Sequence, residues 1–245
     1  MIVTVNPYTC DIVHVVTGSR TYGHFCMLAK TLERVGDRWT LLVVRDLAGG
    51  PKRFTDLIER LGGITPKTLS QRLRDLEDGQ LVEVDRQPGR REVWYRLSAA
   101  GLDLLPALDE LLLWGLRHIA EPPEPGEPAH PEHLLWALRV QLEREGVQPG
   151  PVTWLVRLHD DDSYLIRNDG RTWTIETGET EDPDVLITAT KDSWARFLTI
   201  DPTMRSPVQS EIDIAGTKSA IRTFLKALGA FPHGNNPGRP GHQVH

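Results

Sequence analysis

The sequence predicts two domains: a mainly α domain ending in a β-hairpin, then a separate α+β domain. The chain has 245 residues, which suits two domains of roughly 100–150 residues each. A proline-rich, acidic segment at residues 119–131 divides them, because proline fixes φ and removes backbone donors. Apolar residues recur at helical spacing before this segment, and short alternating runs follow it. We expect an arm at 1–19, a first domain at 20–118, a linker at 119–131, a second domain at 132–231 and a tail at 232–245.

Composition narrows the class of protein. Two cysteines exclude a disulfide scaffold and a multi-cysteine zinc site. No apolar run approaches the roughly 18 residues of a membrane span, so we expect a cytoplasmic protein without a membrane partner. The net charge is −6 but unevenly divided: residues 20–118 hold 16 Lys+Arg against 14 Asp+Glu, and residues 119–245 hold 12 against 19. Only the first half has a balance that could attract phosphates.

The first domain begins with three predicted helices. Phe25, Leu28, Ala29 and Leu32 repeat at helical spacing, residues 39–44 continue as a second helix that ends at 49–51, and residues 53–61 form a short amphipathic helix. After the turn at 62–64, Thr65 suits an N-cap and Pro66 the first helical position. These signals predict that a fourth helix starts at Thr65.

This fourth helix has two contrasting sides. At about 100° per residue, Leu69, Leu73 and Leu76 share one stripe, and a polar, net basic set lies nearly opposite: Lys67, Thr68, Gln71 and Arg74. A helix, a glycine turn and then such a helix are typical of a helix-turn-helix, whose second helix enters the DNA major groove. Gln71 suits an adenine edge, and Arg74 or Lys67 a guanine edge. An ordinary solvated face is the alternative.

A basic β-hairpin follows the predicted recognition helix. Residues 81–86 and 91–97 alternate in character and are joined at Pro88-Gly89. Arg86, Arg90 and Arg91 crowd its tip, so the hairpin suits a wing that reaches backbone phosphates or a minor groove. Thr65, Arg53, Arg90 and Arg91 suit phosphates. Ser98 then caps one long helix with leucines from Leu102 to Leu116, more apolar surface than one face needs, which indicates a dimer interface.

Residues 20–118 resemble the HxlR-type winged-helix regulators, through residues 22–26, 35–40, 69–73, 76–79 and 95–98. The resemblance implies a homodimeric bacterial transcription factor, by family expectation a repressor. Met27 departs from the pattern, since the family usually has proline there. Cys26 occupies a position that responds to electrophiles or oxidants in several relatives, which makes it a candidate redox thiol. We favour the alternative that it is a small buried residue beneath Leu28. His24 and Cys26 are too few ligands for a closed metal site.

The second domain is predicted to combine one sheet with covering helices. A buried helix at 134–142 precedes strands at 152–158, 163–167, 171–176 and 184–190, with a hairpin turn at Asn168-Asp169-Gly170. A helix at 191–199, a short strand at 211–214 and a helix at 218–228 complete an α+β arrangement.

This order of elements resembles the sterol carrier protein type 2 fold, with the strongest similarity at residues 164–170, 183–189 and 212–217. The resemblance implies an apolar tunnel for a lipid, sterol or other hydrophobic molecule. The candidate wall residues are Trp154, Trp173, Trp194, Phe197, Phe224, Leu225 and Phe231. For any one of them we favour an ordinary core position, and composition does not separate a wall from a core because both are lined by apolar groups.

Three functions compete. The first is a dimeric, ligand-responsive transcriptional regulator that binds a double-stranded DNA operator and a hydrophobic effector. The second is a regulator whose C-terminal domain serves only dimerisation or binding of a protein partner. The third is a lipid carrier whose winged helix is an interaction module. No catalytic motif is present in the sequence, so we expect neither an enzyme nor a cofactor.

Overall fold

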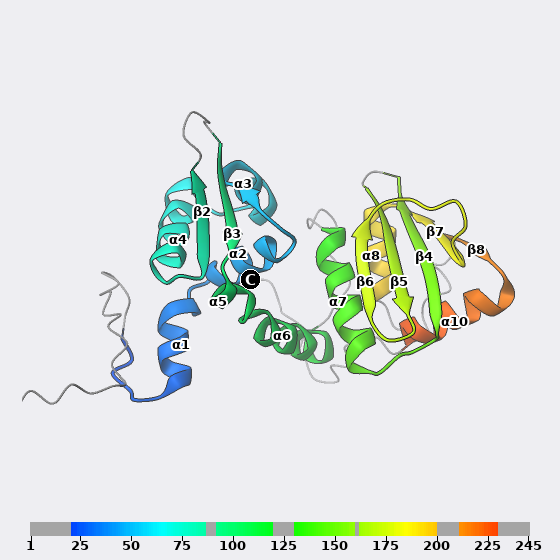
Figure 1. Ribbon diagram of the computed structural model, residues 1–245, viewed down its shortest axis with the longest axis horizontal. Helices are drawn as coiled ribbons and strands as arrows, with labels where there is room; N and C mark the ends of the chain where they lie inside the picture. Colours follow the sequence, from blue (N-terminus) through cyan, green and yellow to red (C-terminus); the bar gives the residue numbers. More distant parts are fainter. Residues whose placement is uncertain (1–20, 87–91, 120–129, 160–161, 200–210, 230–245) are drawn as a thin grey trace, which may run out of the picture. The chain divides into compact units, whose positions relative to one another are not determined.

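The computed structural model describes residues 21–86, 92–119, 130–159, 162–199 and 211–229. The chain divides into two compact units, Met1–Pro106 and Ala107–His245. Figure 1 shows the elements of each unit. The predicted arm, most of the linker, the tail, and the site residues Arg90, Arg91 and Phe231 lie outside the described residues.

The first unit contains the four predicted helices in their predicted places. They are α1 (Met27–Val35), α2 (Thr40–Ala48), α3 (Phe54–Leu61) and α4 (Pro66–Asp78). The hairpin consists of β2 (Val82–Arg86) and β3 (Val93–Leu97), paired antiparallel with Val84 opposite Tyr95. A two-residue strand that the sequence did not indicate, β1 (Lys52–Arg53), pairs with β3 on its other edge. The sheet order is therefore β1-β3-β2 (Figure 1).

The core of this unit lies between the helices and the small sheet. Val43, Val44, Leu57 and Leu69 are fully buried. Asp46 is also buried, and its carboxylate accepts hydrogen bonds from Arg45 on its own helix and from Arg60 on α3, at 3.1 and 3.2 Å. A buried carboxylate without a partner is costly, and the two arginines compensate the charge of Asp46. The pair with Arg60 also joins α2 to α3.

The single long helix predicted after Ser98 is wrong, since the structure has two helices there. Ser98 accepts a hydrogen bond from the Gly101 N–H and caps α5, which spans Ala99–Leu102 only. A second helix, α6, spans Leu105–His118. Pro106 explains the break, because its ring would clash with the Leu102 carbonyl and it has no N–H to donate to it. Proline is tolerated in the first turn of α6 instead.

The second unit is a five-stranded sheet with helices on one face (Figure 1). Its strands are β4 (Pro151–Leu158), β5 (Ser163–Asp169), β6 (Trp173–Thr177), β7 (Val185–Ala189) and β8 (Asp213–Gly216). The order is β6-β5-β4-β7-β8, with β4 and β7 parallel and the other neighbours antiparallel. The helices α7 (Pro131–Arg144), α8 (Lys191–Thr199) and α10 (Lys218–Gly229) pack on the inner face.

Helix α6 groups with this second unit, whereas the sequence places it in the first domain. Leu112 and Leu116 pack against the core of the second unit. The Trp136 indole N–H donates to the Asp109 carboxylate at 2.8 Å, and Arg144 forms an ion pair with Glu110. Among the described residues, no helix is both long and apolar enough to span a membrane.

Two predicted boundaries in the second unit are wrong by a few residues. The hairpin turn starts later than expected: Asn168 belongs to β5, opposite Trp173. The Asp169 carboxylate accepts hydrogen bonds from the N–H groups of Arg171 and Thr172, both at 2.8 Å, and so forms the turn itself. The last strand begins at Asp213 rather than 211, because Asp213 to Gly216 are the residues that pair with β7.

The candidate wall aromatics lie in the core of the second unit. Trp154 contacts Trp173 and Phe224 with ring centroids 5.0 and 5.1 Å apart, and Trp194 stacks on Phe197 at 6.0 Å. All five are buried, and Leu225 packs partly buried against the same cluster.

Gly101 provides a test of the packing in the first unit. A Cβ at this position would lie 2.2 Å from the Leu81 carbonyl oxygen, so neither backbone segment could avoid the clash. We expect Gly101→Ala to lower the free energy of opening of the β2 and β3 amides by about 1–3 kcal/mol, measured by hydrogen exchange. Gly49→Ala is the control, because its nearest neighbours are at 3.8 and 3.9 Å. Equal behaviour of the two variants would contradict the packing described.

Candidate nucleic-acid interface

The turn before α4 and the first residues of that helix determine where it starts. Gly62 and Gly63 adopt φ of +48° and +64°, a region that favours glycine, and reverse the chain after α3. The Thr65 hydroxyl then accepts a hydrogen bond from the Thr68 N–H at 3.1 Å, with Pro66 in the first turn. The predicted N-cap is confirmed.

The rotational setting of α4 is fixed by its leucines. Leu69, Leu73 and Leu76 are 0–2% exposed. Lys67 and Arg74 are exposed on the other side, and Thr68 and Gln71 are half-buried beside them. The structure therefore brings four of the predicted DNA-contacting side chains together on the outer side of one helix.

The Gln71 amide is held at both ends. Its Nε2 donates to the Asp75 carboxylate at 2.7 Å, and its Oε1 accepts from the Arg74 guanidinium at 2.9 Å. In the part of the chain that is described, neither Lys67 nor Arg74 has a carboxylate partner. These two residues carry the uncompensated positive charge of this face.

Two other predicted contact residues are engaged in ion pairs. Arg86, at the end of β2, donates two hydrogen bonds to the Glu77 carboxylate at 2.7 and 2.9 Å, and this lowers the pKa of Glu77. Arg53 binds Asp56 at 3.0 Å and Glu92 at 3.4 Å, and lies over the Trp94 ring. Its hydrogen bonds lower the pKa of Asp56. Arg86 thus links the hairpin to α4, and Arg53 links it to α3.

Sequence reasoning missed the residues that support this face. Arg72 bridges Asp75 at 3.1 Å and Asp37 at 3.4 Å. The spacing of Gln71, Arg72 and Asp75, three or four positions apart on a helix, could have revealed the local part of this network. The contact with Asp37, in the turn between α1 and α2, has no such local signal.

The interpretation of Cys26 as a small buried residue is wrong, because its side chain is exposed at the N-cap of α1. The helix begins at Met27 and turns Leu28 outward as well, so nothing in the described part of the first unit covers either residue.

The interpretation of Cys26 as a redox thiol stays a prediction. It is tested by measuring DNA binding of the wild type and of Cys26→Ser before and after oxidant treatment. If oxidant leaves the binding of both proteins unchanged, the redox interpretation is contradicted.

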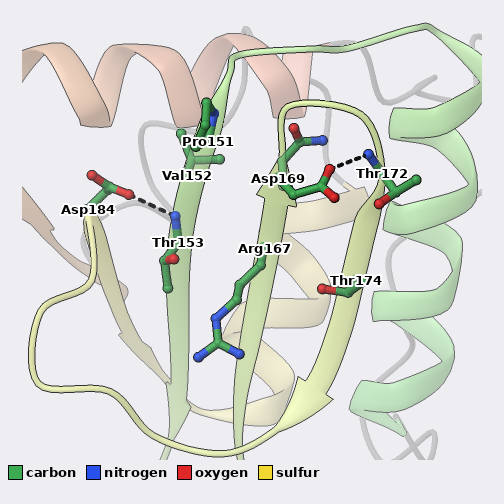
Figure 2. Close-up of a pocket in the computed structure, with 9 residues that line it drawn as sticks. Pro151, Val152, Thr153, Arg167, Asp169, Thr172, Thr174 and Asp184 are labelled. Atoms are coloured by element: carbon green, nitrogen blue, oxygen red, sulfur yellow. Dashed lines mark hydrogen bonds between the residues drawn. The ribbon is translucent and has the colours of Figure 1, made fainter.

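A polar hollow lies on the second unit, away from its aromatic core. Figure 2 shows the Arg167 side chain between Thr153 and Thr174. The carboxylates of this hollow accept backbone hydrogen bonds: Asp184 from Thr153 at 2.7 Å and Asp169 from Thr172 at 2.8 Å (Figure 2). They therefore hold the ends of strands in place. Across the described ranges, no group of three or more side chains could hold a metal ion.

The N-terminal part of the chain, through α6, is similar to known regulators. Residues 34–122 match the HxlR-like helix-turn-helix family. An uncharacterized HTH-type transcriptional regulator of Mycobacterium tuberculosis is 42% identical over 101 residues, which are 40% of this chain and 62% of that protein. The chain thus spans less than two thirds of this relative.

Two relatives from Bacillus subtilis are covered more completely. The HTH-type transcriptional regulator YodB is 35% identical over 99 residues, 40% of this chain and 85% of that protein. YtcD, an uncharacterized HTH-type transcriptional regulator, is 38% identical over 90 residues, 36% of this chain and 71% of that protein. The solved reduced form of YodB covers 41% of this chain and 100% of its own, at 30% identity and a TM-score of 0.36. On the sequence matches, this chain belongs to the HxlR-like helix-turn-helix family of transcriptional regulators.

Proposed function

We propose that this protein is a cytoplasmic, sequence-specific DNA-binding repressor that acts as a homodimer, with α4 as the helix that enters the major groove. The observation that carries this proposal is the division of α4 into a buried leucine side and an outer side bearing Lys67, Gln71 and Arg74. The groove is about 12 Å wide and admits one helix. The match to the HxlR-like helix-turn-helix family over residues 34–122 includes this helix and supports the proposal.

The contact residues divide into two groups by chemistry. Gln71, Arg74 and Lys67 read base edges, because amide and cationic donors match adenine and guanine in the major groove. Thr65, Thr68, Arg90 and Arg91 bind phosphates, which position the protein without specifying sequence. Arg53 and Arg86 contact phosphates only by sharing their guanidinium donors with Asp56 and Glu77, which already occupy them. We assign these two a smaller share of the affinity.

Apolar side chains around α1 support the homodimer. Tyr22, Phe25, Met27, Leu28 and Leu32 are all exposed, and Phe25 is 92% exposed. Five large exposed apolar side chains within eleven residues of the chain favour an interaction surface over scattered surface residues. In the second unit, Leu111 and Trp114 on α6 are exposed as well. A symmetric partner copy would cover both sets, each in an isologous contact.

The second unit is proposed to be a sterol-carrier-like domain that binds a hydrophobic effector. Its support is the predicted order of elements and the aromatic cluster between the sheet and the helices. Trp194 Nε1 is buried and has no hydrogen-bond partner among the described residues, and a buried donor without an acceptor is costly. An effector carrying an oxygen acceptor would satisfy it.

The alternative is that this unit serves only dimerisation or a protein partner. The close ring contacts among the aromatic side chains favour it, because they are what an ordinary filled core shows. A lipid carrier with an accessory winged helix is the third interpretation, and it has the least support because the outer side of α4 would then have no role.

Gln71→Ala and Arg90→Ala test the division of roles on α4 and the hairpin. We expect Gln71→Ala to change sequence preference at one base pair of each half-site, by about 1–3 kcal/mol. Arg90→Ala should weaken binding to every sequence and reduce the slope of log affinity against log salt by about one. The measurement is binding to single-base variants of a selected duplex over a range of salt. Sequence-blind losses in both variants would contradict the assignment.

Native mass spectrometry tests the dimer and the effector together. We expect a dimer for the wild type, monomer for Leu28→Asp, and dimer for Arg34→Asp, which places the same charge on the same exposed helix outside the apolar set. A dimer that carries extra mass, lost on denaturation, would support an occupied pocket. A bare dimer would favour the dimerisation-only alternative, and a wild-type monomer would contradict the paired-helix geometry.

A further inference from the structure

A continuous chain of polar contacts runs from the α1–α2 turn to the outer side of α4. Asp37 accepts from the Trp39 N–H at 3.0 Å and pairs with Arg72 at 3.4 Å. Arg72 pairs with Asp75 at 3.1 Å, and Asp75 accepts from Gln71 at 2.7 Å. The chain therefore links the start of α2 to the amide that we assign to base reading.

The partners of Gln71 allow its amide one orientation. A carboxylate only accepts hydrogen bonds and a guanidinium only donates them. The Nε2 end must therefore face Asp75 and the Oε1 end must face Arg74. A flipped amide would set two acceptors together at one end and two donors at the other. Each end of the amide keeps a second hydrogen-bonding position, one N–H and one lone pair, for a base edge.

Asp75 is itself held in place. Its side chain is 22% exposed and that of Arg72 is 24% exposed, so this ion pair is screened less than a fully exposed one. Arg72 contributes separate nitrogens to Asp75 and to Asp37. Arg72 also pairs with Asp37 in the α1–α2 turn. If the Asp75 carboxylate moved with a rotating Gln71 amide, it would therefore lose its contact with Arg72.

We infer that Asp75 is a positioning residue that sets which way the Gln71 amide faces and hence which base pair α4 accepts. Arg72 and Asp37 hold Asp75 in place through their ion pairs. The inference rests on the proposed role of Gln71 in the major groove. Adenine presents N7 as acceptor and N6 as donor, and this order reverses between A·T and T·A. A fixed amide presents its donor and acceptor in one order only, whereas an amide free to flip presents them in both orders and discriminates less between the two pairs.

A network that merely fastens α4 to α2 would behave differently. Its loss would lower the stability of the first unit and weaken binding to all sequences together. Loss of positioning changes the preference between A·T and T·A at one base pair and leaves affinity for unrelated DNA unchanged.

The experiment compares wild type, Asp75→Asn and Asp78→Asn. Asn is isosteric with Asp but can both donate and accept, so it removes the requirement at the Nε2 end of the amide and leaves only the exposed Arg74 guanidinium to favour one orientation. Asp78→Asn is the matched control, because it removes the same charge from an exposed residue on the same helix. A duplex selected from a random pool by the wild type is varied at the pair that Gln71→Ala identifies. Affinity for each variant, affinity for unrelated duplex and the thermal midpoint are measured.

We expect the wild type and Asp78→Asn to prefer one of A·T and T·A by roughly tenfold or more, and Asp75→Asn by less than about threefold. Unchanged preference in Asp75→Asn would overturn the inference, as would a uniform loss on all duplexes with a lowered midpoint. If Gln71→Ala changes preference at no base pair, the proposed role of Gln71 fails as well. If it does change preference but Asp75→Asn does not, the role of Gln71 stands and that of Asp75 falls.

Discussion

Burial of three leucines on α4 is the constraint on which the rest of the first unit depends. Leu69, Leu73 and Leu76 occupy the inner stripe of the helix and are 0–2% exposed. Burying each side chain contributes roughly 1.5–3 kcal/mol, so rotating α4 to expose them would cost several times what an exposed ion pair contributes, which is about 0–1 kcal/mol. That setting alone determines that Lys67, Gln71 and Arg74 face outward. The Thr65 cap fixes the start of the helix, and the ion pairs of Arg53 and Arg86 hold the hairpin beside it.

The core of the second unit is built from one sheet and its covering helices. Its sheet buries one face under three helices and fills the space with aromatic side chains. The close ring contacts in this core are those of a filled interior, and they support dimerisation as the alternative to ligand binding. The buried Trp194 N–H is the feature that an ordinary filled core does not explain. A regulator with this organisation would require a coupling free energy between the units, typically about 1–3 kcal/mol.

Local signals in the sequence predicted most elements correctly. Thr65 and Pro66 locate the start of α4, and leucine spacing gives its two sides, because both depend on residues within one or two turns. Prediction failed where distant or competing contacts decide. Pro106 divides a helix whose leucine pattern alone looks continuous. The sequence predicts Asn168 in the hairpin turn, but Asn168 belongs to β5, because it pairs with Trp173. The exposure of Cys26 depends on where α1 packs. The contact between Asp37 and Arg72 joins residues that are far apart in the sequence. No periodic pattern in the sequence indicates either feature.

We propose that α4 reads DNA from the major groove as one of a symmetric pair. Methylation interference by dimethyl sulfate on a selected duplex tests it most directly, because guanine N7 lies in the major groove and adenine N3 in the minor groove. We predict that N7 methylation blocks binding at two clusters about one helical turn, or roughly 34 Å, apart. Interference confined to adenine N3, or a single unpaired cluster, would contradict the account.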